Sequence, residues 1–261
     1  MGLNSKQLEA VRYYIGDVSG NDPFWGSGKA YLVLNSLFYP GISTESARAA
    51  EKKYLEPEIL ADTERLVGLL TDLLSAFTPA GREIMCCRVE RAADYAQMKS
   101  AGRTLSFTST STAGFLSAYQ DRLGIALMEF EITPDCPCID MAQALESYAK
   151  PDEQEVLLPP FLGLNITELP LTQEHMRITD AAGQPPELFC HAIPYVMPCN
   201  AEPETLPVGG NEAGMRVLKA LNSGTAPEKD DVELYVKWKS ALVSILCSTA
   251  AAFTLDFSAG I

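Results

Sequence analysis

The sequence predicts an α+β fold, and three observations along the 261-residue chain support that class. The first eighty residues carry apolar side chains at helical spacing, whereas the residues after Gly81 form short apolar runs separated by turn residues, as strands do. Helical patterns interrupt the strands and return near the carboxyl terminus. We expect a main domain over residues 1–200, with a helical part over 1–80 and a strand-rich part over 81–200, followed by a linker and helical extension over 201–261.

Three residues mark expected helix starts in the first part of the chain. Asn4, Ser27 and Ser43 each precede apolar residues at helical spacing and are residue types that cap helix amino termini. The helix that Ser27 would cap is expected to stop at Pro40-Gly41. A strong one-sided apolar stripe from Leu60 to Phe77 predicts a further helix, whose apolar face belongs to the core.

Short apolar runs bounded by turn residues predict the strands, and helical patterns lie between and after them. The predicted strands are Glu83–Glu90, Arg103–Ser109, Gly124–Thr133, Gln154–Leu158, Phe161–Leu169, Met176–Thr179 and Leu188–Tyr195. The predicted helices that interrupt them are Ala92–Lys99, Ala113–Arg122 and Met141–Tyr148. Beyond a loop over Pro194–Gly214, helices are predicted over Glu212–Leu221 and Val232–Phe253.

Composition excludes several classes of function. With 20 basic and 34 acidic residues the net charge is -14, and no basic patch stands out, so we expect no nucleic-acid partner. The seven cysteines form no evident disulfide framework, which favours a reducing compartment. The spacing of Cys136, Cys138, Cys190, His191 and Cys199 matches no usual zinc site, so no metal is expected.

One charge-free segment, Ser240–Leu255, requires its own interpretation. It is shorter than the roughly 20 apolar residues that span a bilayer, and it is rich in Ser, Thr and Ala. We therefore expect a buried helix or one that docks a partner or regulator, and no membrane segment. The stretch Met1–Gly20 has no apolar signal core, so we expect synthesis in the cytoplasm without signal-peptide secretion.

Three features that carry chemistry follow one another in the chain. They are Arg88 in Cys86-Cys87-Arg88-Val89-Glu90, the run Phe107-Thr108-Ser109-Thr110-Ser111, and Glu153-Gln154-Glu155 followed by Val-Leu-Leu-Pro. In this order they resemble the Arg, Ser-Thr-Ser, Glu-x-Glu signature of the arginine-specific mono-ADP-ribosyltransferases, a group of bacterial toxins and vertebrate surface enzymes. The resemblance covers about residues 81–170 and implies a mixed β-sheet core of that family's type.

The resemblance implies that the first two features bind NAD, which is a substrate in this family. Arg88 would pair with the phosphates, a task suited to a planar fork of donors that keeps its charge. Contacts to the nicotinamide amide would come from the backbone at Val89. Ser109 would orient the catalytic carboxylate or the nicotinamide ribose, with Thr110 and Ser111 supporting the strand end. Alternatively, Arg88 is a surface residue paired with Glu90 or Asp94, and the hydroxyls belong to a polar strand or a helix cap.

The resemblance implies separate roles for the two carboxylates. Glu155 would accept a hydrogen bond from the ribose 2'-hydroxyl and stabilise the positive charge that builds on the sugar. Glu153 would orient the incoming guanidinium of a protein arginine and remove its proton. Residues two apart on a strand share a face, so the two could share a site if Glu153 lies in or beside the strand. The alternative for Glu155 is an exposed carboxylate at a strand edge.

Aromatic rings in the segment after Ser111 are candidates for stacking on nicotinamide. By the resemblance these are Phe115 and Tyr119, although their i to i+4 spacing is equally that of ordinary helix packing. The function implied is transfer of ADP-ribose from NAD to an exposed arginine of a protein acceptor. Two alternatives are an NAD glycohydrolase, with water as acceptor, and a non-catalytic NAD-binding or interaction protein. The resemblance to toxins also allows an effector delivered to another cell without a signal peptide.

Overall fold

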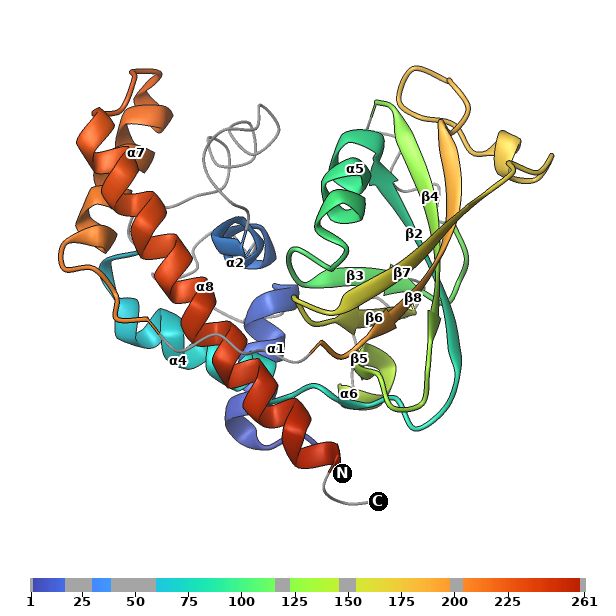
Figure 1. Cartoon of the computed structure of the whole chain (residues 1–261), viewed down its shortest axis with the longest axis horizontal. Coiled ribbons are helices and arrows are strands. Elements are labelled where there is room, and N and C mark those ends of the chain that lie inside the picture. Colours follow the sequence, from blue (N-terminus) through green and yellow to red (C-terminus); the bar gives the residue numbers. More distant parts are fainter. Residues whose placement is uncertain are drawn as a thin grey trace. The chain divides into compact units, whose positions relative to one another are not determined.

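The computed structural model consists of two compact units, which Figure 1 shows as a group of helices and a β-sheet. Unit 1 comprises Met1–Ala76 and Pro198–Ile261, and unit 2 comprises Phe77–Met197. The α+β class is therefore confirmed. The helices on both sides of unit 2 in the sequence belong to one unit. The structure describes residues 2–16, 30–38, 60–115, 123–145, 154–197 and 204–258.

Helices in unit 1 occur where apolar residues repeat at helical spacing. The predicted cap Asn4 is confirmed, because its side-chain oxygen accepts hydrogen bonds from the backbone N–H groups of Lys6 and Gln7, each at 3.0 Å. The caps predicted at Ser27 and Ser43 lie outside the described residues. The helices are α1 (Ser5–Ile15), α2 (Ala30–Phe38), α4 (Thr63–Leu74), α7 (Gly210–Ser223) and α8 (Lys229–Ser258).

The helix predicted from the stripe of residues 60–77 is shorter than expected. It ends at Leu74, and Phe77 belongs to the other unit. A tighter turn follows, because the Ala76 N–H bonds the Leu73 carbonyl, and the chain then enters strand β1 (Thr78–Pro79). The sequence pattern extended the predicted helix too far because Ala76 and Phe77 are also buried, although neither belongs to the helix.

Helices α7 and α8 contact each other closely because two glycines face two large aromatic side chains. Tyr235 and Trp238 of α8 are fully buried. An added Cβ at Gly210 would lie 2.4 Å from the Trp238 Cβ, and one at Gly214 would lie 2.6 Å from the Tyr235 Cδ2. In the part of the chain that is described, no helix is both long and apolar enough to cross a membrane.

We predict that Gly214→Ala destabilises unit 1, although alanine is the better helix former. The added methyl would force a shift in a packed interior, costing about 1–3 kcal/mol, which exceeds the gain of about 1 kcal/mol in helix propensity. The matched control is Gly68→Ala in α4, where a Cβ meets nothing within 4 Å, so stability should rise. Urea unfolding followed by circular dichroism would measure both. Equal stabilisation by the two variants would show that α7 and α8 do not pack this closely.

Unit 2 is built on one eight-stranded mixed sheet of order β1-β5-β6-β3-β2-β4-β8-β7. Neighbouring strands are antiparallel except β4 and β8, which are parallel. Five of the predicted strands agree closely with observed ones. Besides β1, the strands are β2 (Ile84–Arg91), β3 (Thr108–Ser111), β4 (Ile125–Ile132), β5 (Pro137–Asp140), β6 (Glu155–Leu158), β7 (Gly163–Leu169) and β8 (Leu188–Tyr195).

Two of the strand predictions need correction. In the run Arg103–Ser109 only the last two residues are in β3, because Thr104 uses its hydrogen bonds to hold the turn after β6. The strand predicted over Met176–Thr179 is wrong, since a 3-10 turn spans His175–Arg177. There, the N–H groups of Met176, Arg177 and Ile178 donate to carbonyls three or four residues earlier in the chain, so they are not available to a neighbouring strand.

The helices of unit 2 agree less well with prediction. The helix predicted over Ala92–Lys99 is confirmed as α5 (Ala92–Ala101). The next one is wrong at its start, since residues 113–115 are not helical, and residues 116–122 lie outside the described residues. Of the helix predicted over Met141–Tyr148, the structure describes a single turn, α6 (Met141–Ala144).

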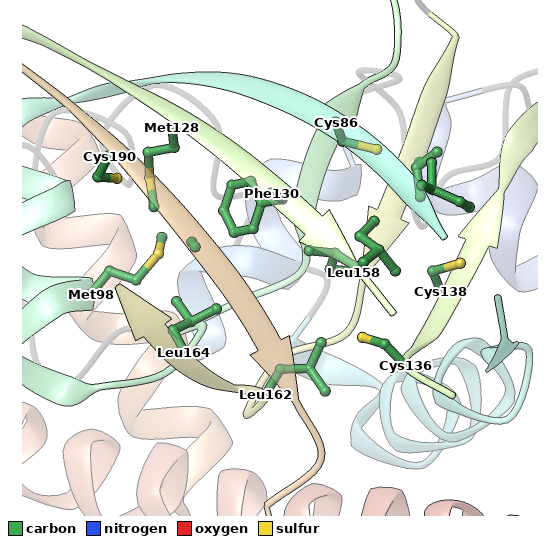
Figure 2. Close-up of a cluster of buried hydrophobic side chains, with 14 of the residues drawn as sticks. Cys86, Met98, Met128, Phe130, Cys136, Cys138, Leu158, Leu162, Leu164 and Cys190 are labelled. Carbon is green, nitrogen blue, oxygen red and sulfur yellow. The ribbon is translucent and has the colours of Figure 1, made fainter. Parts of the chain in front are cut away.

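The core of unit 2 contains several buried thiols. Figure 2 shows Cys86, Cys136, Cys138 and Cys190 among apolar side chains such as Phe130. The cysteines that the structure describes are free. Burial raises the pKa of these thiols from an ordinary value of 9.0 to about 11 for Cys86 and about 12 for the other three. They are therefore protonated at neutral pH and behave as small apolar side chains.

We predict that these thiols make stability fall at alkaline pH. The folded thiols keep their protons to higher pH than unfolded ones, so their contribution is complete below about pH 9 and is lost as the pH rises towards about 12. Each fully shifted thiol contributes a slope of about 1.4 kcal/mol per pH unit in that window. Cys136→Ala should unfold more easily at neutral pH but show a shallower alkaline slope. Identical slopes in urea titrations of the two proteins would contradict the raised pKa.

Candidate active site

The sheet brings the three sequence features onto three neighbouring strands. Strand β3 lies between β2 and β6, and these three strands carry Ser109, Arg88 and Glu155 respectively. Strands β3 and β6 pair over four residues, with Ser111 opposite Glu155. Strands β2 and β3 are paired at Cys87 and Ser111. Residues far apart in the chain thus lie in one short stretch of sheet.

Alternation along the strands divides the hydroxyl-rich run between two faces. Ser109 and Ser111 share a face with Glu155, because Ser111 is directly opposite Glu155 and Ser109 is two residues along. Thr110 faces the core instead, and its hydroxyl donates to the Val156 carbonyl at 2.7 Å. Glu155 and Ser111 are both buried, with exposed fractions of 8% and 7%. A carboxylate and two hydroxyl groups therefore lie on one face of β3 and β6.

The guanidinium of Arg88 connects β2 to the backbone of β3. Its Nη1 donates to the Ser109 carbonyl at 2.7 Å, and its Nε donates to Oε2 of Glu90 at 2.7 Å. Its Nη2 forms an ion pair with the same carboxylate oxygen. The ion pair with Glu90 that the alternative interpretation expected is therefore present. Arg88 is no surface residue, however, since its side chain is only 16% exposed. It is held in place from two directions by charge-assisted hydrogen bonds.

Strand β6 lies between two non-glycine residues with left-handed backbone. Gln154, before the strand, has φ 43°, and Phe161, after it, has φ 71°. This conformation costs roughly 1–2 kcal/mol for residues other than glycine, so each must be stabilised by its surroundings. In both cases a threonine that flanks β3 provides hydrogen bonds, Thr112 for Gln154 and Thr104 for the turn containing Phe161.

The threonine at the Phe161 end is completely buried. The Thr104 hydroxyl donates to the Pro159 carbonyl and accepts from the Leu162 N–H, each at 3.0 Å. Its backbone carbonyl accepts from the Phe161 N–H at 3.0 Å. The turn therefore has its buried polar groups satisfied by one residue, which fixes where β6 ends.

Two further predicted cofactor-binding residues lie in one apolar cluster. Val89 is buried beside Leu127 and Phe189, and the half-buried Phe115 packs against the same cluster. The Phe115 ring makes edge contacts with Phe189 and His175, at centroid distances of 6.2 and 5.8 Å. Val89 is two residues from Cys87 on β2, so this cluster lies on the sheet face of Ser111 and Glu155.

Some predicted site residues lie outside the described part of the chain, and the structure shows further residues that support the site. Glu153 and Tyr119 lie outside the described residues, so their positions stay predictions. Glu90, which the alternative interpretation named as a partner of Arg88, holds the guanidinium in place, and its i to i+2 spacing on a strand is consistent with that pair. Thr112 has no comparable signal in the sequence. Among the residues described, no three or more His, Cys, Asp or Glu gather closely enough to hold a metal ion.

No family model matches the sequence, and no curated protein sequence matches it. Solved structures of three bacterial proteins are similar to 74% of the chain. The Vis toxin, an ADP-ribosyltransferase from Vibrio splendidus, is 16% identical over 75% of its length, with a TM-score of 0.40. Plx2a, an ADP-ribosyltransferase toxin from Paenibacillus larvae, is 14% identical over 88% of its length, with a TM-score of 0.43. The enzymatic component C2-I of the Clostridium botulinum C2 toxin is 14% identical over 43% of its length, with a TM-score of 0.38. At these scores the likeness is remote, and function must be inferred from this chain's own residues.

Proposed function

We propose that this protein is a mono-ADP-ribosyltransferase that transfers ADP-ribose from NAD to an arginine of a protein acceptor and releases nicotinamide. One observation carries the proposal. Arg88, Ser109 and Glu155, which match the ordered signature, lie on three adjacent strands, and the first two are in direct contact. A chance occurrence of the three motifs would give no reason for them to lie on adjacent strands.

Arg88 would hold the phosphates of NAD. A guanidinium presents a fixed fork of donors and keeps its charge at any physiological pH, so it suits a phosphate. The bonds to Glu90 and to the Ser109 carbonyl support this role, because they hold the fork before the substrate arrives. A group that is held in advance loses less conformational entropy on binding.

Glu155 would act at the bond between the ribose C1' and the nicotinamide nitrogen. As that bond breaks, its electron pair leaves with nicotinamide and positive charge builds on the sugar. A carboxylate that accepts a hydrogen bond from the ribose 2'-hydroxyl stabilises this charge. Ser109 on the same face would orient the carboxylate and the ribose. Burial of Glu155 supports the role, since charges interact more strongly away from water.

Transfer to arginine requires a second group at the acceptor. A new bond forms between C1' and a guanidinium nitrogen, and that nitrogen loses a proton. Glu153 is the proposed base, because a carboxylate two residues before Glu155 is the family's arginine-directed arrangement. NAD is consumed as a substrate, and none of these steps uses a metal.

We predict that Glu155→Gln lowers the rate of nicotinamide release from NAD by about 100- to 1000-fold. The amide keeps the shape of the side chain but loses the charge that stabilises the transition state. Nicotinamide release is measured by chromatography. The matched control is Glu129→Gln, because Glu129 lies in the same row across the sheet as Glu155, three strands away. Equal activity of wild type and Glu155→Gln would refute the role of Glu155.

Thermal unfolding with NAD separates an enzyme from a non-catalytic interaction protein. A ligand that binds only the folded state raises its stability, by about 2.7 kcal/mol at a concentration 100 times the dissociation constant. Wild type and Glu155→Gln should both be stabilised by NAD, because the proposed role of Glu155 is in the transition state. The absence of any shift at millimolar NAD would favour an interaction protein that does not bind NAD.

Glu153→Gln tests the acceptor separately. We predict that this variant loses transfer of ADP-ribose to agmatine, a small guanidine, by more than about tenfold while it keeps most of its NAD hydrolysis. Removal of the acceptor's proton needs a base, whereas departure of nicotinamide does not. Labelled product is measured with and without agmatine. An equal loss of both reactions would count against a separate acceptor role for Glu153, and no transfer by the wild type would favour the glycohydrolase alternative.

A further inference from the structure

We propose that Thr112 is a positioning residue for Glu155 in the proposed transferase reaction. Thr112 follows β3 directly, and Gln154 precedes β6 directly. The Thr112 N–H donates to the Gln154 carbonyl at 3.1 Å, and the Thr112 hydroxyl lies 2.8 Å from Oε1 of Gln154. The pair thus extends the β3–β6 contact by one residue beyond Ser111 and Glu155. The inference rests on the proposed function, since it concerns the same carboxylate.

The contact matters because of the backbone conformation of Gln154. With φ 43°, Gln154 is one of two described non-glycine residues in the left-handed region. A residue in this region relaxes to extended or helical backbone unless other contacts prevent it. Relaxation at Gln154 would redirect the chain at the residue before Glu155. The direction of the Glu155 side chain therefore depends on what holds Gln154.

Thr112 holds Gln154 through its backbone N–H, which donates to the Gln154 carbonyl, and through its hydroxyl, which contacts the Gln154 side chain and, at 3.5 Å, the same carbonyl. The backbone bond persists with any residue except proline at that position, whereas the bond to the side chain requires a hydroxyl. A hydroxyl can donate to an amide oxygen or accept from an amide nitrogen, so the contact holds for either orientation of the Gln154 amide. The contribution specific to threonine at position 112 is thus its hydroxyl.

Exposure of the pair distinguishes positioning from stability. Thr112 and Gln154 are both exposed, in contrast to the buried Thr104 at the other end of β6. An exposed hydrogen bond contributes little to folding because water replaces it at small cost. Removing the Thr112 hydroxyl should therefore leave the fold intact and affect only the placement of Glu155.

The test compares Thr112→Val, Thr112→Ser and Thr133→Val in nicotinamide release from NAD. Thr133 is a matched control, because it lies in unit 2 and its hydroxyl also makes an exposed hydrogen bond, to Asp135 at 2.7 Å. We expect kcat of Thr112→Val to fall on the order of tenfold with KM for NAD unchanged, because misplacement by 1 Å can cost up to about 100-fold. Thr112→Ser should recover most of kcat. Melting temperatures of all variants should stay within about 3 °C of wild type.

A double variant shows whether Thr112 acts through Glu155. If it does, Thr112→Val should have almost no further effect in the Glu155→Gln background, because the group that it positions is already disabled. An independent role would instead give the full loss again. Near-additive effects would therefore overturn the inference.

The outcomes separate this inference from the proposed function. If wild type cleaves NAD and Glu155→Gln does not, but Thr112→Val equals Thr133→Val, the function stands and the role of Thr112 is wrong. A raised KM with unchanged kcat, or a loss that serine does not recover, would also overturn it. If wild type neither binds nor cleaves NAD, the proposed function fails and the inference fails with it.

Discussion

The antiparallel pairing of β3 with β6 is the constraint on which the candidate site depends. It sets Ser111 opposite Glu155 and places Ser109 two residues along on the same face. A slip of one residue in this register would turn Glu155 into the core and Val156 out of it. The buried side chains of Val156 and Leu158 oppose that slip, because they fill the core on the other face. Packing on one face thereby fixes the chemistry on the other.

Such a short strand pair also needs support at its ends. Four residues provide few hydrogen bonds, and the chain leaves β6 on both sides through left-handed residues, Gln154 and Phe161. The buried Thr104 makes hydrogen bonds to the turn after β6, and the exposed Thr112 makes hydrogen bonds to the residue before β6. The contrast has a physical meaning. A buried, fully bonded end contributes to folding, whereas the exposed bond at the Thr112 end contributes little to folding and acts on the backbone next to Glu155.

Much of the fold follows from periodic patterns, while the site's supporting contacts do not. Long regular elements such as β4 and α8 were predicted because their apolar spacing repeats. Strand β5 was missed because Pro137–Asp140 has only four residues and begins and ends with proline and aspartate, which are depleted in strands. The signature residues were found by their order. The bond between Arg88 and Ser109 was not, because a contact to a backbone carbonyl leaves no trace in residue type.

The order Ser-Thr-Ser follows from the two faces of the strand. A strand in this position needs polar groups on the face of Glu155 and a core-compatible side chain between them. Thr110 meets the second need, because its methyl group packs in the core while its hydroxyl is satisfied by the Val156 carbonyl. Valine would pack there without that bond, and serine would bond without the β-branched shape that strands favour. The middle residue therefore contributes to the sheet, and only the outer two share the face of Glu155.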